Sequence, residues 1–166
     1  MINMKKVYLS TFLLALSYIA NAQVSYGDNF LVDYNVKINV STENDSTYLT
    51  LILTSEKLKM SDSPKLLLRM MDDTVFSLDG HLLSASNKSE GAVLIGSVAV
   101  AVNHFITEAK FPITKDQIEQ LSKGVKKLRL NTSPKFHEKE WHRDKIGKKL
   151  YAKYKESSAN SFEDNF

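Results

Sequence analysis

Hydrophobic and polar residues alternate along a segment near the start of the chain. Every second residue of this segment is apolar: Phe30, Val32, Tyr34, Val36, Ile38 and Val40. A period of two is typical of a strand that buries one face. Residues 41–46 are polar and predict a turn, and residues 47–54 alternate again, with leucine at every second position from Leu49 to Leu53. The pattern therefore predicts a β-hairpin.

Strand-like segments continue through most of the chain. Six of them lie at 65–71, 74–78, 81–86, 92–102, 104–114 and 125–130. The dipeptide Asp79-Gly80 favours a type I′ turn, so the second and third of these segments are expected to form a tight hairpin. Residues 87–91 predict a polar turn. Gly96 predicts a bulge within one strand over residues 92–102.

Two helices are predicted towards the C-terminus. Thr114 and Gln117 match a capping box, so a short helix is expected over residues 115–122, ending at Gly124. Residues 138–155 are predicted to form a second helix, because apolar side chains recur there at helical spacing. The members of this stripe are Trp141, Ile146, Leu150, Tyr151 and Tyr154. The last residues, 157–166, are expected to form a flexible tail.

Short strands without regular strand–helix alternation favour an antiparallel architecture. We expect a mainly β fold, an immunoglobulin-like antiparallel β-sandwich, with a short helix before the last strand and a C-terminal α-helix. An open α+β sheet is the alternative. The chain has 166 residues, of which 43% are hydrophobic and 25% charged, so its composition is that of a globular protein. Residues 23–156 are expected to form one domain.

The first 22 residues have the features of a secretory signal peptide. Lys5 and Lys6 precede an apolar run of 14 residues, and Ala20-Asn21-Ala22 matches an A-x-A cleavage signal. A membrane-spanning helix needs about 20 apolar residues, so the run is short for an anchor. We expect export to the periplasm, the cell surface or the medium, with no transmembrane segment after cleavage. An uncleaved N-terminal anchor helix is the alternative.

Charge is distributed unevenly along the chain. Residues 23–109 carry five more acidic than basic residues, whereas residues 110–166 carry six more basic than acidic ones. The basic residues that could form one face are Lys126, Lys127, Arg129, Lys148, Lys149 and Lys153. Such a run is usually a solvated face, but it could also bind an anionic surface. Nucleic acid is not expected as a partner, because no binding motif is present.

No pattern typical of an active site, a cofactor site or a metal site is found in the sequence. His137 and His142 approach the metalloprotease motif H-E-x-x-H, but the second histidine is one position too far along to share a helix face. The carboxylates Asp72, Asp73 and Asp79 are explained by strand ends and a turn. The chain has no cysteine, which excludes disulfides, thiol nucleophiles and cysteine-ligated metals. We therefore predict no catalytic residue, no cofactor and no metal.

Aromatic side chains are the other candidates for ligand contacts. Tyr48 lies on the strand face opposite the leucines, and Trp141 begins the predicted helical stripe. Exposed rings can stack on sugars or anchor a protein partner, although Trp141 is better explained as a packing residue. We expect an exported, non-enzymatic binding or accessory module of the bacterial envelope, with an unknown protein or glycan partner. A hydrolase whose carboxylates meet only in the fold and a binder of anionic surfaces are the alternatives.

The last third of the chain resembles the ending of a group of small exported proteins. The residues that carry the resemblance are Phe111-Pro112-Ile113-Thr114, Gln117-Ile118, Leu121, Gly124-Val125, Lys127-Leu128-Arg129-Leu130, Trp141 and Asp144-Lys145-Ile146-Gly147. With Asn21-Ala22-Gln23, this ending is similar to that of Gram-negative envelope proteins of the β-sandwich type that have no assigned activity. The resemblance implies a sandwich and export, and it brings no catalytic residue with it.

Overall fold

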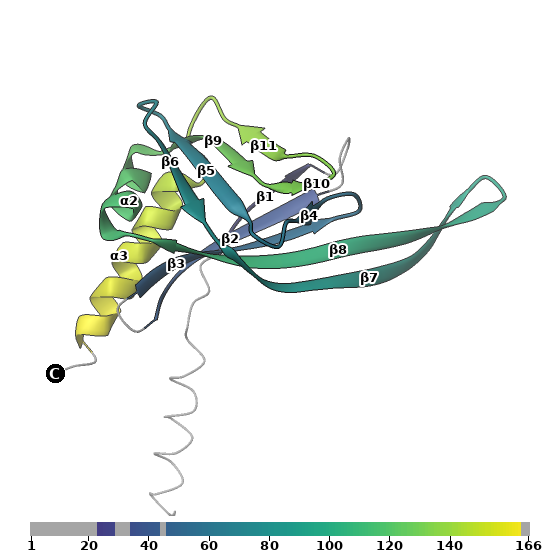
Figure 1. Cartoon of the computed structure of the whole chain (residues 1–166), viewed down its shortest axis with the longest axis horizontal. Coiled ribbons are helices and arrows are strands. Elements are labelled where there is room, and N and C mark those ends of the chain that lie inside the picture. The colour runs from purple at the N-terminus through teal and green to yellow at the C-terminus, as the bar shows by residue number, and fades with distance from the viewer. Residues whose placement is uncertain (1–22, 29–33, 44–45, 164–166) are drawn as a thin grey trace, which may run out of the picture.

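The computed structural model describes residues 23–28, 34–43 and 46–163 (Figure 1). These residues form a mainly β structure with antiparallel sheets and a C-terminal helix, which confirms the predicted class at that level. The predicted signal peptide, residues 1–22, lies outside the described residues, and so does the beginning of the first predicted strand, residues 30–33.

Within the described part of the chain, the strands form three antiparallel sheets. The five-stranded sheet has the order β1 (Val24–Asp28), β2 (Tyr34–Glu43), β3 (Ser46–Ser55), β8 (Val98–Ile113) and β7 (His81–Ile95). The four-stranded sheet has the order β11 (His137–Glu140), β9 (Val125–Leu130), β5 (Lys65–Met70) and β6 (Val75–Asp79). A short pair joins β10 (Thr132–Ser133) to β4 (Lys59–Met60).

The strands β2 and β3 form the predicted hairpin. They pair from Tyr34 opposite Ser55 to Glu43 opposite Ser46, so the turn is shorter than the predicted 41–46. The alternating apolar face is buried, as the period of two predicts. Its fully buried members are Val36, Ile38, Leu49, Leu51 and Leu53.

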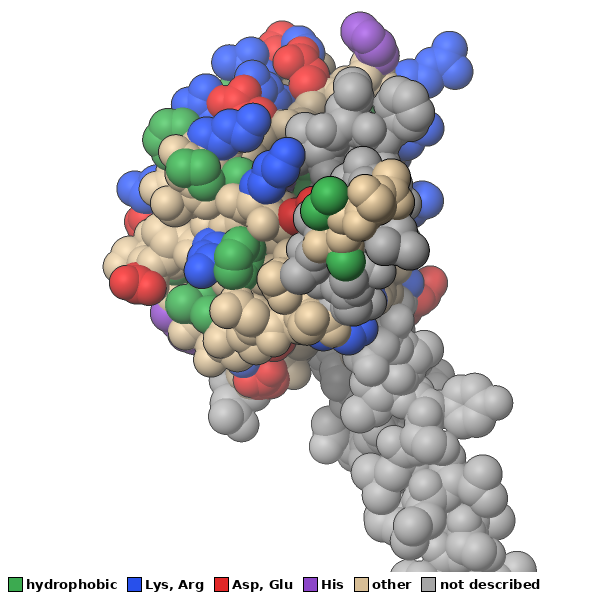
Figure 2. Space-filling model, turned by 90° about the vertical axis from the view of Figure 1, so that its right-hand side faces the viewer, with side chains coloured by type: hydrophobic (Ala, Val, Ile, Leu, Met, Phe, Trp, Pro, Cys, Tyr) green, Lys and Arg blue, Asp and Glu red, His purple; other side chains and the backbone are tan. Residues whose placement is uncertain are grey.

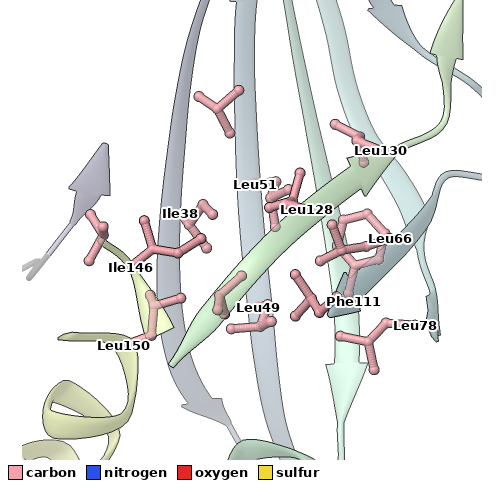
Figure 3. Packing of buried hydrophobic residues seen from close by; sticks show 14 of the residues in the cluster. Ile38, Leu49, Leu51, Leu66, Leu78, Phe111, Leu128, Leu130, Ile146 and Leu150 are labelled. Carbon is pink, nitrogen blue, oxygen red and sulfur yellow. The ribbon is translucent and has the colours of Figure 1, made fainter. Parts of the chain in front are cut away.

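One hydrophobic cluster is shared by the two larger sheets and the C-terminal helix (Figure 3). Leu51 of β3, Leu66 of β5 and Leu128 of β9 are each at most 1% exposed, and so is Leu150 of the helix. Burying a leucine side chain contributes about 1.5–3 kcal/mol to stability. Contacts between the sheets, together with the helix against β2, therefore hold the fold together without any disulfide.

The capping box predicted before the first helix is present. The Thr114 hydroxyl accepts a hydrogen bond from the Gln117 backbone N–H at 3.2 Å, and the Gln117 side chain accepts one from the Thr114 N–H at 3.0 Å. Helix α2 (Lys115–Gln120) continues into the 3-10 turn η1 (Leu121–Lys123). It ends at Gly124, whose φ of 85° suits a residue without a side chain.

The dipeptide Asp79-Gly80 does not form the predicted hairpin turn. β6 pairs with β5 and β7 pairs with β8, so the chain crosses from one sheet to the other at Gly80. Neither residue has the positive φ that a type I′ turn requires. Gly80 is needed for a different reason, because a Cβ there would lie 2.5 Å from the ring of Phe111. The hairpin is instead β5–β6, which turns through Asp73 at a φ of 63°.

The predicted turn over residues 87–91 and the single strand over residues 92–102 are also wrong. β7 continues through the polar segment to Ile95, and β8 begins at Val98. Gly96, with a φ of 64°, lies in the turn between them. A bulge and a turn both favour glycine, so composition alone did not separate the two.

The predicted helix over residues 138–155 begins later than expected. His137–Glu140 is strand β11 and pairs with β9, while helix α3 runs from Gly147 to Glu163. Trp141 therefore precedes the helix, although Leu150 does face the core as predicted. Helix α3 also includes residues 157–163, which were expected in the tail, and residues 164–166 lie outside the described part.

Candidate functional site

The β7–β8 hairpin extends well beyond the sheet to which it belongs (Figure 1). β7 and β8 pair from His81 opposite Lys110 to Ile95 opposite Val98. β3 pairs with β8 only as far as Ser55 opposite Phe105. Beyond that pair the hairpin continues alone, and we call residues 88–104 the arm. At about 3.3 Å a residue, the part of β8 beyond Phe105 is about 23 Å long.

The outer part of the arm has no charged residue. Among residues 91–102, Ser97 alone has a polar side chain, and the rest are Gly, Ala, Val, Leu and Ile. At the tip, Val98 is 61% exposed, and Ala99 is exposed as well. Seen end-on, hydrophobic side chains stand out at the projecting arm, whereas basic and acidic side chains intermingle over the upper part of the body (Figure 2).

The register of the arm divides its residues between two faces. Successive pairs in an antiparallel ladder alternate between the faces. Val93 opposite Val100 and Ile95 opposite Val98 therefore share one face. One alanine pair, Ala92 with Ala101, and one leucine–alanine pair, Leu94 with Ala99, occupy the other. Both faces are thus apolar by sequence, whereas an antiparallel strand pair with one face in water usually carries polar residues on that face.

Aromatic side chains and one histidine join the edges of the two larger sheets. The Tyr26 hydroxyl lies 3.1 Å from Nε2 of His137. Tyr34 meets the His137 ring edge to face with centroids 4.5 Å apart, and Trp141 meets Tyr26 in the same way at 5.1 Å. Trp141 is 8% exposed, so this predicted contact residue mainly packs. Sequence reasoning missed Tyr26 and His137 as partners, because nothing local connects them.

Burial governs the ionisation of this cluster. Desolvation, with a smaller contribution from Lys139, lowers the pKa of His137 to about 4. Burial, with a smaller contribution from the neighbouring Tyr34, raises the pKa of Tyr26. The phenol of Tyr26 therefore stays protonated and can donate to the neutral imidazole of His137. This arrangement stabilises the junction between β1 and β11.

Tyr48 lies where it was predicted, on the face of β3 opposite the buried leucines. Its ring is half-buried, and Nζ of Lys110 lies 4.2 Å from the ring centroid. The same ammonium group also pairs with Glu43 at 2.5 Å. Tyr48 is thus already contacted by Lys110 of the neighbouring strand β8. Lys110 is not one of the six basic residues that were predicted to form a face, and the contact does not involve Trp141.

The predicted basic residues fall on two elements. On β9, Lys126 pairs with Asp73 and Lys127 with Glu138, each at 2.8 Å, and Arg129 also pairs with Glu138. Hydrogen bonding to these cations lowers the pKa of both carboxyl groups, which therefore stay ionised beside them. The other three lie on helix α3: Lys148, Lys149 and Lys153. The β9 cations are therefore partly neutralised by their own neighbours, which reduces the field they present to an anionic surface.

Shallow hollows lie on the described surface, and the lining of two of them bears on the predicted functions. The first, of about 240 Å³, is at the base of the arm and is lined by Lys59, Ala85, Ser86, Asn87, Phe105 and Thr107. The second, of about 160 Å³, is lined by Leu67, Arg69, Val75, Lys127 and Arg129. Neither hollow is lined by a carboxylate, so neither provides the pair of acids that a glycoside hydrolase uses.

His137 and His142 lie on and just after a strand, so the helical spacing considered for a metal site does not arise. Across the described ranges, no three His, Cys, Asp or Glu side chains are grouped as a metal site would require. No helix in the part of the chain that the structure describes is long and apolar enough to cross a membrane. Comparison of the chain with protein-family models, curated proteins and solved structures finds no match.

Proposed function

We propose that this chain is an exported, non-enzymatic binding module of the bacterial envelope that binds a partner polypeptide through the arm. The observation that carries the proposal is the apolar, uncharged hairpin that continues beyond the end of β3. Exposed apolar surface, which Val98 and Ala99 provide at the tip, often marks an interaction site. The signal-like residues 1–22 support export from the sequence side.

A polypeptide fits the arm better than a glycan or a lipid does. Beyond Phe105 the outward edge of β8 carries backbone N–H and C=O groups that no described strand pairs. A partner strand can satisfy these groups, and its own apolar side chains then lie beside those of β8 on each face of the extended sheet. Hydrocarbon cannot satisfy them, and a sugar would bring hydroxyl groups against valine and alanine.

The scaffold we propose for this module is an immunoglobulin-like sandwich related to small Gram-negative envelope proteins. Its support is the shared hydrophobic cluster between the five-stranded and four-stranded sheets. The two alternatives, a carboxylate hydrolase and a binder of anionic surfaces, have less support. The two hollows lack carboxylates, and the β9 cations are paired.

Site-specific cross-linking in intact cells tests the proposal. The chain has no cysteine, so Ser97→Cys introduces one attachment point at the arm tip and Ser77→Cys introduces a matched one at an exposed position of β6. A photoreactive maleimide on residue 97 should yield a discrete protein adduct that mass spectrometry identifies. The adduct should disappear when Val98→Lys is added. Equal adducts from both positions, or none from either, would contradict binding through the arm.

A further inference from the structure

We infer that the polypeptide that binds the arm is a second copy of this chain, and that the two arms pair antiparallel through residues 98–102 of β8. This inference rests on the proposed function, because it names the partner of the same surface. It follows from three features of the arm: a free edge, a self-complementary sequence and a matching length.

The free edge lies on one side of β8. β7 occupies the opposite edge along the whole arm, and β3 occupies this edge only from Phe105 onwards. No described strand pairs with this edge over residues 98–103. Natural edge strands are usually protected by charges, by proline or by a covering segment. Residues 98–102 contain neither a charged residue nor proline, so this edge has no such protection in its sequence.

The sequence of this edge is the same in both directions. Residues 98–102 read Val-Ala-Val-Ala-Val. If two copies pair antiparallel about Val100, Val98 lies opposite Val102 of the second copy and Ala99 lies opposite its Ala101. All valines then share one face of the joint sheet and all alanines share the other. This is the self-complementarity that a two-fold symmetric interface requires.

The length of the edge matches this register. With Val100 on the two-fold axis, the turn at Gly96 and Ser97 of the second copy lies beside Asn103 and His104 of the first. The next residue of β8 is Phe105, where β3 begins to pair. The second arm and the β3 ladder would therefore occupy successive parts of the same edge, and the turn of the second arm would meet His104, whose Nε2 lies 3.7 Å from a carboxylate oxygen of Glu56. The product would be a four-stranded sheet made of two hairpins.

The charge of the arm is compatible with a second copy. Two identical proteins repel each other wherever their contact surfaces carry net charge, and residues 91–102 carry none. The excess positive charge of the chain lies instead after residue 109. The contact surface can therefore approach its own copy without bringing like charges together.

The oligomeric state of the exported protein tests this inference. Light scattering after gel filtration should give the mass of two chains for the wild type. Val100→Lys places two ammonium groups at the axis and should give the mass of one chain. The control Val75→Lys, at a position that is 51% exposed on β6, should leave the dimer unchanged. A monomeric wild type, or a dimer that survives Val100→Lys, would overturn the inference.

The register can be tested independently with disulfides. Opposed Cα atoms in antiparallel strands are about 4.5–5.5 Å apart, which suits a disulfide. Val100→Cys should therefore form a cross-linked dimer with itself under mild oxidation. Ala99→Cys should cross-link only after mixing with Ala101→Cys. Equal cross-linking by all three variants alone would overturn the register.

The outcomes separate this inference from the proposed function. If the wild type is monomeric and residue 97 cross-links to a different polypeptide, the second copy is wrong and the binding module stands. If the wild type is monomeric and residue 97 cross-links to nothing, both fail. Unchanged circular dichroism for Val100→Lys would show that loss of the dimer is not loss of the fold.

Discussion

The hydroxyl of Tyr26 lies 3.1 Å from Nε2 of His137, although the two residues are 111 positions apart in the chain. Tyr26 belongs to β1, at the edge of the five-stranded sheet, and His137 belongs to β11, at the edge of the four-stranded sheet. One hydrogen bond therefore joins the outermost strands of two different sheets. His137 is only 4% exposed, so the bond lies in an environment where losing it is costly.

Acid should destabilise the protein through His137. Its pKa is about 4 in the folded chain, against an ordinary histidine value of 6.5, so the unfolded state binds more protons between these values. The stability that the buried, neutral His137 contributes is fully present above pH 6.5. It is lost as the pH falls from 6.5 to about 4, by at most about 3 kcal/mol. The free energy of unfolding, measured with urea at about pH 7, 5.5 and 4.5, should fall more steeply with decreasing pH for the wild type than for His137→Gln. An equal dependence on pH in both proteins would contradict the assignment of the effect to His137. His142→Gln, at an exposed position, is the control and should keep the pH dependence of the wild type.

Tyr26→Phe should destabilise the fold by about 1–2 kcal/mol, because Nε2 of His137 loses its hydrogen-bond partner in a buried site. The ring contacts with Tyr34 and Trp141 can remain. Urea unfolding at neutral pH measures the change. Tyr151→Phe, on a half-buried tyrosine of α3, should change stability by less than about 0.5 kcal/mol. An equal loss in both variants would show that the hydroxyl of Tyr26 has no special role.

Asp144 should be the most sensitive carboxylate of the described chain. Its side chain accepts backbone N–H groups from Val125 at 2.9 Å, Ile146 at 3.2 Å, Gly147 at 2.8 Å and Lys148 at 2.9 Å. It thus caps helix α3 and ties that helix to β9. Burial opposes ionisation, but the four hydrogen bonds outweigh it and lower the pKa of Asp144.

Asp144→Ala should therefore lower the free energy of unfolding by about 2–3 kcal/mol, which is more than the loss of an ordinary helix N-cap side chain. Asp144→Asn, which keeps one acceptor oxygen, should cost less. Thermal and urea unfolding measure both, and Asp62→Ala, in an exposed loop, is the matched control. A cost for Asp144→Ala no larger than that of the control would refute the capping role.

Gly80→Ala should destabilise the protein by about 1–3 kcal/mol through overpacking. The added methyl group would lie 2.5 Å from the ring of Phe111, which is fully buried and has little freedom to move away. Ser77→Ala, at an exposed position on the adjoining β6, should change stability by less than about 0.5 kcal/mol. A stable Gly80→Ala variant would mean that glycine is not required where the chain crosses between the sheets.

Local patterns predicted the elements that depend on near neighbours. The alternation from Tyr34 to Leu53 predicted a hairpin with one buried face, and β2 and β3 confirm it. The capping box at Thr114 and Gln117 is also present. In both cases the decisive contacts lie within a few residues along the chain or across a short turn. Residue order alone is therefore sufficient to predict this hairpin and this helix cap.

Pairings between distant segments were not predictable in this way. The residues of β11 are polar and do not alternate, and they form a strand because β9 supplies hydrogen bonds from the neighbouring position. Asp79-Gly80 has the composition of a turn, yet the separate partners of β6 and β7 make it a crossing between sheets. The free edge of the arm exists because β8 is longer than β3, which no local pattern encodes.

Residue order was sufficient to establish the antiparallel β class, the β2–β3 hairpin, the first helix and the uncharged character of residues 91–102. The assembled fold was needed to show that these residues form a projecting hairpin, and that Tyr26 meets His137. The physical reason is that alternation and capping depend on short-range sterics and hydrogen bonds. Strand partners depend on which distant segments can bury their faces together, and that competition involves the whole chain.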